Sequence, residues 1–97
     1  IPNLPAEACV EVPCLVDGDG INPCYMGELP LQLAAMNASN IYAQLLTIEA
    51  AATGKKQYIY NAAMMDPLTG GELNIKDIYA MVDELLEAHK DWLPEYK

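Results

Sequence analysis

The feature that most constrains the fold is a continuous, almost uncharged stretch from Pro30 to Thr53. It contains one charged residue, Glu49, and neither Gly nor Pro after its first position. Proline suits the first turn of a helix, where its missing N–H group is not needed, and Gly54 suits the position just past a helix end. Ala, Leu, Met and Gln favour helix intrinsically. The sequence therefore predicts one helix over residues 30–53, about 36 Å long.

This helix is apolar around most of its circumference, and such a helix is normally buried on most sides. A chain of about 100 residues hides only about 60–65% of its unfolded surface. We therefore expect that the chain cannot enclose this helix alone. Because the chain also begins at Ile1 rather than Met, we expect a piece of a larger protein or an obligate oligomer. The main apolar face consists of Leu31, Ala34, Ala35, Ala38, Ile41, Tyr42, Leu45, Ile48 and Ala52.

Two short segments before this helix predict a β-hairpin over about residues 8–27. Cys9–Asp17 is rich in Val and alternates loosely, and Ile21–Met26 returns after the turn Asp17–Gly20. Two glycines in a short polar turn between such segments are the strongest local hairpin signal. Pro13 donates no ladder hydrogen bond, so it is expected at an edge or a bulge.

The sequence after Gly54 predicts two further helices. Apolar residues at helical spacing indicate a helix over 55–65, which Asp66–Pro67 ends because a residue before proline avoids the helical region. Residues 68–73 contain Thr-Gly-Gly and are expected to form a loop. Asn74 is a helix N-cap, so a last helix with one buried face is predicted over 75–91. The fold class is α+β, in a single unit over residues 1–97.

Composition excludes several classes of function. The chain is 53% hydrophobic, unlike a disordered protein, and its net charge of −9 leaves no basic patch for nucleic acid or an anionic membrane. Polar residues between Gln32 and Glu49 interrupt any apolar run long enough to span a membrane. Three cysteines, an odd number, and no secretory signal segment favour a reduced, cytoplasmic setting.

The cysteines do not form a recognisable metal motif. Cys9, Cys14 and Cys24 lack C-x-x-C spacing, and the only histidine is His89. If the hairpin turns at Gly18–Asp19, Cys14 and Cys24 fall nearly opposite each other, which permits a cross-strand disulfide. Free thiols on a half-buried sheet are the preferred interpretation, and a redox or metal switch at this pair is a further hypothesis.

Acidic residues in the predicted turn resemble the start of a calcium loop. Asp17 and Asp19 have the right spacing, and Glu28 follows eleven residues after Asp17. The pattern then fails, because Asn22 stands where the loop needs glycine and Pro23 follows. A hairpin turn explains the same residues.

The remaining polar and aromatic candidates have structural interpretations. Glu11 is expected on the solvent face of its strand, and His89 at the end of the last helix, where it compensates the helix dipole. We expect Trp92 and its neighbours to pack back onto the chain. No Gly-rich phosphate loop, triad or basic cluster occurs, so no catalytic, cofactor-binding or metal residue is assigned. The aromatic residues expected in core and interface are Tyr25, Tyr42, Tyr58, Tyr60, Tyr79 and Trp92.

Seven motifs occur in order along almost the whole chain. They are N-L-P (3–5), V-E-V-P (10–13), D-G-x-G-I-x-P (17–23), G-E-L-P-x-Q-x-A-A-M-N (27–37), T-I-E-A-A (47–51), A-M-M-D-P-L-T (63–69) and M-V-D-E-L-L-E-A-H-x-D-W-L-P (81–94). Together they resemble the C-terminal region of glycoside hydrolase family 4, in particular its α-galactosidase and α-glucuronidase branch. The order of hairpin and helix also resembles the C-terminal domain of lactate and malate dehydrogenases.

This resemblance implies a parent enzyme that cleaves α-glycosides by oxidation and elimination with NAD and a divalent metal, usually manganese. In the family, the dinucleotide-binding glycines, the metal ligands and the base lie upstream of this region. No ligand role therefore passes to the cysteines or to His89. The resemblance implies a C-terminal structural and oligomerisation part of a two-domain enzyme, with a dinucleotide-binding domain, a homo-oligomer and a glycoside substrate as partners. The isolated chain is expected to be inactive; the alternative is a self-standing oligomerisation or protein-binding module.

Overall fold

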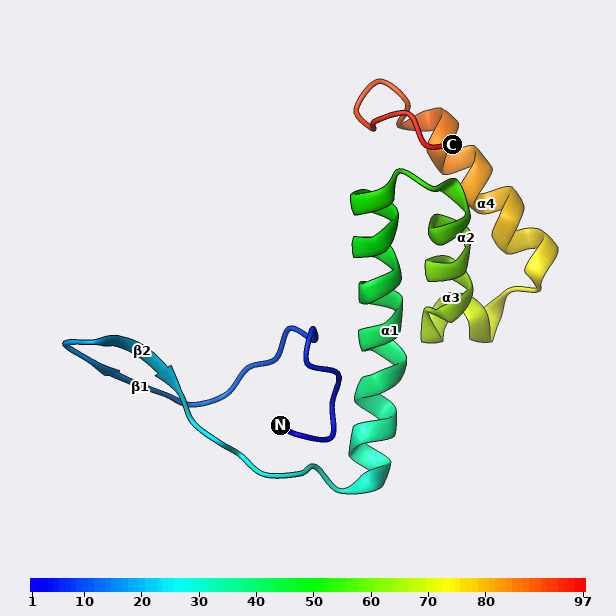
Figure 1. Cartoon of the computed structure of the whole chain (residues 1–97). Helices are drawn as coiled ribbons and strands as arrows, with labels where there is room; N and C mark the ends of the chain where they lie inside the picture. Colours follow the sequence, from blue (N-terminus) through cyan, green and yellow to red (C-terminus); the bar gives the residue numbers. More distant parts are fainter.

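The computed structural model describes all 97 residues and consists of a projecting hairpin followed by four helices. Figure 1 shows the hairpin standing away from the helices, while the N-terminal segment lies beside the first half of α1. The α+β class is therefore confirmed. The elements are β1 (Cys14–Asp17), β2 (Gly20–Pro23), α1 (Leu31–Thr53), α2 (Lys56–Met65), α3 (Pro67–Glu72) and α4 (Ile75–Ala88).

The long helix α1 begins and ends where the sequence predicts. Pro30 is its N-cap residue, with φ −50° and ψ 140°, so its missing N–H group costs no helical hydrogen bond. Gly54 ends the helix in the left-handed conformation at φ 69°, and its N–H group donates to the carbonyl oxygen of Ala50. A glycine adopts this conformation without the Cβ clash of other residues.

The hairpin is shorter than predicted. The strands cover 14–17 and 20–23 instead of 9–17 and 21–26, with Cys14 opposite Pro23 and Val16 opposite Ile21. Pro13 limits the ladder because it has no N–H group to donate to Cys24, which lies opposite it. The turn forms as expected: the Asp17 carboxylate accepts from the Asp19 N–H group at 2.9 Å, and Gly20 has φ 122°.

The predicted loop over 68–73 is wrong, because Pro67–Glu72 form the short helix α3. Asp66 ends α2 and also caps α3, since its Oδ2 atom accepts from the Thr69 N–H group at 2.9 Å. Pro67 then occupies the first turn, where proline is favoured. Gly70 fits against the end of α2 because an added Cβ would lie 2.6 Å from the Met64 carbonyl oxygen.

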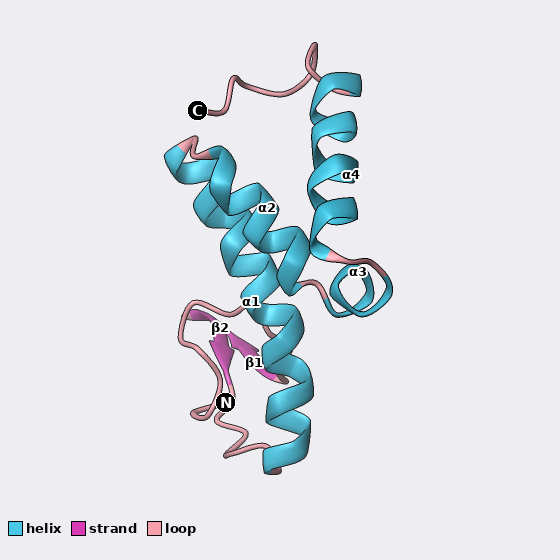
Figure 2. Ribbon diagram, turned by 90° about the vertical axis from the view of Figure 1, so that its right-hand side faces the viewer, coloured by secondary structure: helices cyan, strands magenta, loops and turns pink.

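Helix α4 packs on α2 and forms the small core. Asn74 caps it as predicted, accepting from the Asp77 N–H group at 3.0 Å. The helix ends at Ala88, not at residue 91, because the chain turns there and the Trp92 N–H group donates to the His89 carbonyl oxygen. The fully enclosed part of the core comprises Tyr60, Ile78 and Val82. Figure 1 shows α1 and α2 side by side, with α4 beyond α2, and in the turned view of Figure 2 α2 overlaps α1.

Both ends of the chain are fastened to the junctions of α1. The Asn3 amide donates to the Leu29 carbonyl oxygen at 2.8 Å and accepts from the Leu29 N–H group at 3.0 Å. At the other end, Lys97 exchanges backbone hydrogen bonds with Gly54 and Lys56, both at 2.8 Å. The C-terminal segment therefore returns as expected, but Trp92 does not pack, since its side chain is 88% exposed.

The chain leaves much more surface uncovered than a compact protein of its size. Its radius of gyration is 17.0 Å, against about 12.5 Å expected for this length. Its accessible surface is 7304 Å², against roughly 5,500 Å² expected for its mass. Along α1, only Ala34, Ile41 and Ala50 are buried. The expectation that this chain cannot enclose the long helix is confirmed, and within these residues that helix is mostly exposed. No helix is both long and apolar enough to cross a membrane.

Candidate functional site

The three cysteines are exposed free thiols; Cys14 and Cys24 lie on the hairpin, and Cys9 lies near α1. The strand register puts Cys14 opposite Pro23, and the Cys24 N–H group bonds the Pro13 carbonyl oxygen. Cys14 and Cys24 are thus offset by one residue, which places their side chains on opposite faces of the ladder. The free thiols and the near-opposite placement agree with the interpretation from the sequence. The expected half-buried sheet is wrong, because every residue of both strands is exposed.

The acidic residues and the histidine do not gather into a metal site. Asp17 is occupied within the turn, since its Oδ1 atom accepts from the Asp19 N–H group and from the Asn22 amide at 3.3 Å. Glu11 is exposed, as expected for a solvent-facing side chain, and His89 is the C-cap residue of α4. Nowhere do three His, Cys, Asp or Glu side chains come together to hold a metal ion.

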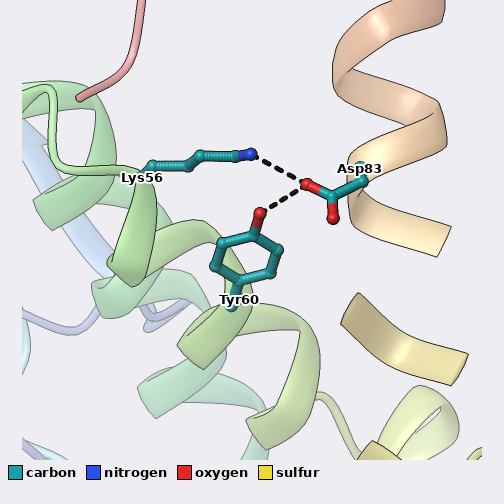
Figure 3. A network of polar contacts seen from close by, with 3 residues as sticks. All are labelled: Lys56, Tyr60 and Asp83. Atoms are coloured by element: carbon teal, nitrogen blue, oxygen red, sulfur yellow. Dashed lines mark hydrogen bonds and ion pairs between the residues drawn. The ribbon is translucent and has the colours of Figure 1, made fainter. Parts of the chain in front are cut away.

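The most developed polar arrangement joins α2 to α4. The Lys56 ammonium lies 2.8 Å from Oδ1 of Asp83, and the Tyr60 hydroxyl donates to the same oxygen. Figure 3 shows both donors reaching from α2 to this single carboxylate on α4. Tyr60 also stacks on Tyr79, with ring centroids 4.3 Å apart, and Gln57 donates to the Tyr79 hydroxyl at 3.2 Å.

These contacts set the charge states of the group. The hydrogen bond from Lys56 and then the one from Tyr60 lower the pKa of Asp83 below its ordinary value of 3.8. The same bond to Asp83 raises the pKa of Lys56 well above its ordinary value. The carboxylate and ammonium are therefore both charged at neutral pH and bind each other. Because both are half exposed and already paired, the arrangement joins two helices and offers no free base or nucleophile.

Sequence reasoning missed this network for a physical reason. Lys56 and Tyr60 are one turn apart on α2, which was a visible hint of a shared face. Their partner Asp83 lies on a different helix and looked like an ordinary solvent-facing acid beside the apolar stripe of α4. Only the packing of α4 on α2 brings the three side chains together.

The surface that stands out is the apolar one along α1 and the hairpin. Leu31, Met36, Tyr42 and Ile48 of α1 are between 54% and 83% exposed, and Glu49 is the only charge on that helix. The acidic residues of α4 lie on the other side of the helical part, beyond α2 (Figures 1 and 2). Exposed apolar areas of this extent mark interaction surfaces in soluble proteins. The apolar side chains left uncovered on the hairpin and its flank are Leu15, Val16, Ile21, Tyr25 and Met26.

The chain as a whole exposes an excess of area that is comparable with a large interface. The accessible area exceeds the compact expectation by roughly 1,800 Å². A standard protein–protein interface covers about 800 Å² on each partner, and permanent interfaces cover more. An exposed apolar surface of this extent fits contact with other polypeptide.

Comparison with known families gives one match that covers most of the chain. The model of the family 4 glycosyl hydrolase C-terminal domain matches residues 1–69.

Individual relatives extend this similarity to the whole chain. It is 60% identical over all 97 residues to an alpha-galactosidase of Bacillus subtilis, of which it spans 22%. It is 38% identical over 96 residues, or 99% of the chain, to an alpha-galactosidase of Rhizobium meliloti, of which it spans 20%. A maltose-6'-phosphate glucosidase of Fusobacterium mortiferum is 32% identical over the whole chain, which spans 21% of that protein. The chain thus covers about a fifth of the length of these curated relatives.

Proposed function

The chain belongs to the family 4 glycosyl hydrolase C-terminal domain family, and on this premise we propose that it is the C-terminal structural part of a larger glycosidase. The whole enzyme hydrolyses α-glycosides in the cytoplasm by oxidation and elimination. It consists of a dinucleotide-binding domain, which precedes this region, and the domain to which residues 1–97 contribute.

The observation that carries this proposal is the 60% identity, over every residue of the chain, to a protein named alpha-galactosidase. That relative is several times longer than the chain, so a catalytic centre outside this region is compatible with the match. The relatives named as phosphate-sugar glucosidases are more distant, at 32% identity or less. A non-phosphorylated α-galactoside is therefore the substrate that the similarity favours.

Within such an enzyme, the role of this region is to provide contact surface. Helix α1 lies between the N-terminal segment and α2, yet keeps side chains such as Leu31, Tyr42 and Ile48 exposed. We propose that the dinucleotide-binding domain and a second subunit cover these side chains. The hairpin then supports the substrate side of the parent's site.

We propose that the rest of the enzyme, and not this chain, binds NAD and manganese. The residues of this chain do not fit either group. Cys14 and Cys24 lie on the hairpin, Cys9 lies near α1, and His89 lies at the far end of α4. No three ligand side chains converge. The turn with Gly18 and Gly20 joins two antiparallel strands, and Gly70 and Gly71 lie within α3, so neither offers a strand-to-helix phosphate cradle. No catalytic step is assigned to this chain.

A chimaera tests the proposal directly. The C-terminal 22% of the Bacillus subtilis relative, which the chain matches, is replaced by residues 1–97. With NAD⁺ and Mn²⁺ present, the chimaera is expected to hydrolyse p-nitrophenyl α-galactoside, while the isolated chain does not. A soluble, folded chimaera without activity, or turnover by the isolated chain, would overturn the proposal.

A further inference from the structure

The hairpin is the least covered part of the molecule. Its two outer edges differ in the backbone N–H groups that they offer to a further strand. Every residue of β1 and β2 is exposed. A two-stranded ribbon of this length is marginal in water without a third strand or another covering element. Figure 1 shows no other element of the chain beside it.

The register determines which amides point outward. In an antiparallel pair, opposed residues alternate between those that exchange hydrogen bonds and those whose backbone groups face away from the partner. The Cys24 N–H group bonds the Pro13 carbonyl oxygen at 2.9 Å, so 13–24 is a bonded pair. The pairs Cys14–Pro23 and Val16–Ile21 are therefore the outward-facing ones.

The two outer edges differ in their donors. On β1, Cys14 and Val16 both present N–H groups to the outside. On β2, Ile21 presents one, but the next outward position is Pro23, which has none. Proline at such a position interrupts an edge and prevents further pairing. The β1 edge is therefore open to a third strand, and the β2 edge is closed after one residue.

The side chains on one face of the ribbon are also suited to burial. Opposed residues point to the same face, so Cys14, Val16, Ile21 and Pro23 share one face of the ribbon. That face is entirely apolar, although Val16 is 71% and Ile21 72% exposed. The other face carries Asp17 and Asn22, bonded to each other. A covering segment therefore meets no charge on the first face.

We propose that an extended, uncharged segment from the preceding part of the glycosidase adds to the outer edge of β1 and lies with the apolar face inward. This inference rests on the proposed function, because the curated relatives contain about four-fifths of their length outside the matched region. A second copy of β1 fits less well. Paired antiparallel about Leu15, it would place Asp19 of one chain opposite Glu11 of the other, and each chain carries a net charge of −9.

Amide hydrogen exchange tests the inference without any substitution. In the chimaera described above, the Val16 amide is expected to exchange at least about tenfold more slowly than in the isolated chain, because a third strand protects it. The Ile21 amide is expected to exchange at similar rates in both proteins. Equal rates for Val16 in the two proteins, or equal protection of Val16 and Ile21, would overturn the inference.

Two matched substitutions provide a second measurement. Val16→Pro and Ile21→Pro each remove one outward N–H group from the same opposed pair and leave the internal hairpin bonds intact. In the chimaera, Val16→Pro is expected to raise the unfolding equilibrium constant about tenfold more than Ile21→Pro. In the isolated chain the two variants are expected to behave alike, because both amides face solvent there.

The outcomes separate the inference from the function on which it rests. An active chimaera with an unprotected Val16 amide overturns the strand addition and leaves the proposed function standing. An inactive, folded chimaera with a protected Val16 amide overturns the proposed function and leaves the strand addition standing. Protection of Val16 in the isolated chain that grows with protein concentration would identify a second copy as the occupant and overturn the inference.

Discussion

Replacing Gly70 with alanine tests how tightly the corner between α2 and α3 is packed. A Cβ atom at this position would lie 2.6 Å from the carbonyl oxygen of Met64 and 3.6 Å from its carbonyl carbon. The obstacle is backbone at the end of α2, so no side-chain rotation relieves it. Gly71 is the matched control, because a Cβ atom there has nothing within 4 Å. Neither glycine has a positive φ.

The magnitude follows from two opposing contributions. Alanine in a helix is favoured over glycine by about 0.5–1 kcal/mol, mainly through the entropy of the unfolded chain. Restoring an ordinary contact of about 3.4 Å requires a shift of roughly 0.8 Å between α3 and α2, and such overpacking costs about 1–3 kcal/mol. Gly70→Ala is therefore expected to destabilise by about 0.5–2 kcal/mol, whereas Gly71→Ala stabilises by about 0.5–1 kcal/mol.

Urea unfolding, followed by helical circular dichroism at one protein concentration, measures both variants against the unsubstituted chain. The midpoint is expected to fall for Gly70→Ala and to rise for Gly71→Ala, with unchanged slopes. Equal or greater stability of Gly70→Ala relative to Gly71→Ala would refute the close approach of α3 to the end of α2.

Three further substitutions probe separate contacts. Asp83→Asn is expected to lower the urea midpoint at neutral pH, because it removes the charged acceptor of Lys56 and Tyr60. The pKa of Asp83 is lowered in the folded chain, so the stability that this carboxylate contributes is present above pH 3.8, its ordinary pKa, and is lost as pH falls through the folded pKa. The difference in urea midpoint between Asp83→Asn and the unsubstituted chain should therefore shrink in acid. A pH-independent difference would argue against the ion pair. Asn3→Ala removes both bonds to Leu29 and is expected to cost about 1 kcal/mol and to speed exchange of the Leu29 amide; unchanged exchange would argue against this anchor. Ile48→Lys, at a side chain 59% exposed, is expected to change stability by less than about 0.5 kcal/mol yet to weaken self-association in sedimentation, and unaltered association would exclude this part of α1.

Local signals in the sequence were sufficient for the helices that carry their own start and stop residues. Pro30 and Gly54 bound α1, and Asn74 caps α4, as predicted. A start signal of the same kind also precedes α3, although a loop is predicted there from the sequence. Asp66 followed by Pro67 ends one helix and also starts another, but the two glycines after it outweighed that pattern in the prediction.

Features that depend on contacts between distant residues were not predictable in this way. The partner of Lys56 and Tyr60 is 23 residues or more along the chain, and only helix packing identifies Asp83. Likewise, the relation of Cys14 to Cys24 depends on a register that a single residue of offset reverses. The sequence does predict that α1 needs cover from other polypeptide, because a helix that is apolar around most of its circumference, as residues 30–53 are, is normally buried.

Under the proposed function, other polypeptide covers the apolar surface of α1 and the hairpin. Analytical ultracentrifugation of the isolated chain at several concentrations tests it most directly. We predict species heavier than 10.6 kDa whose proportion grows with concentration. A monodisperse 10.6 kDa monomer that is folded at every concentration would contradict the claim, because that surface would then be stable in water by itself.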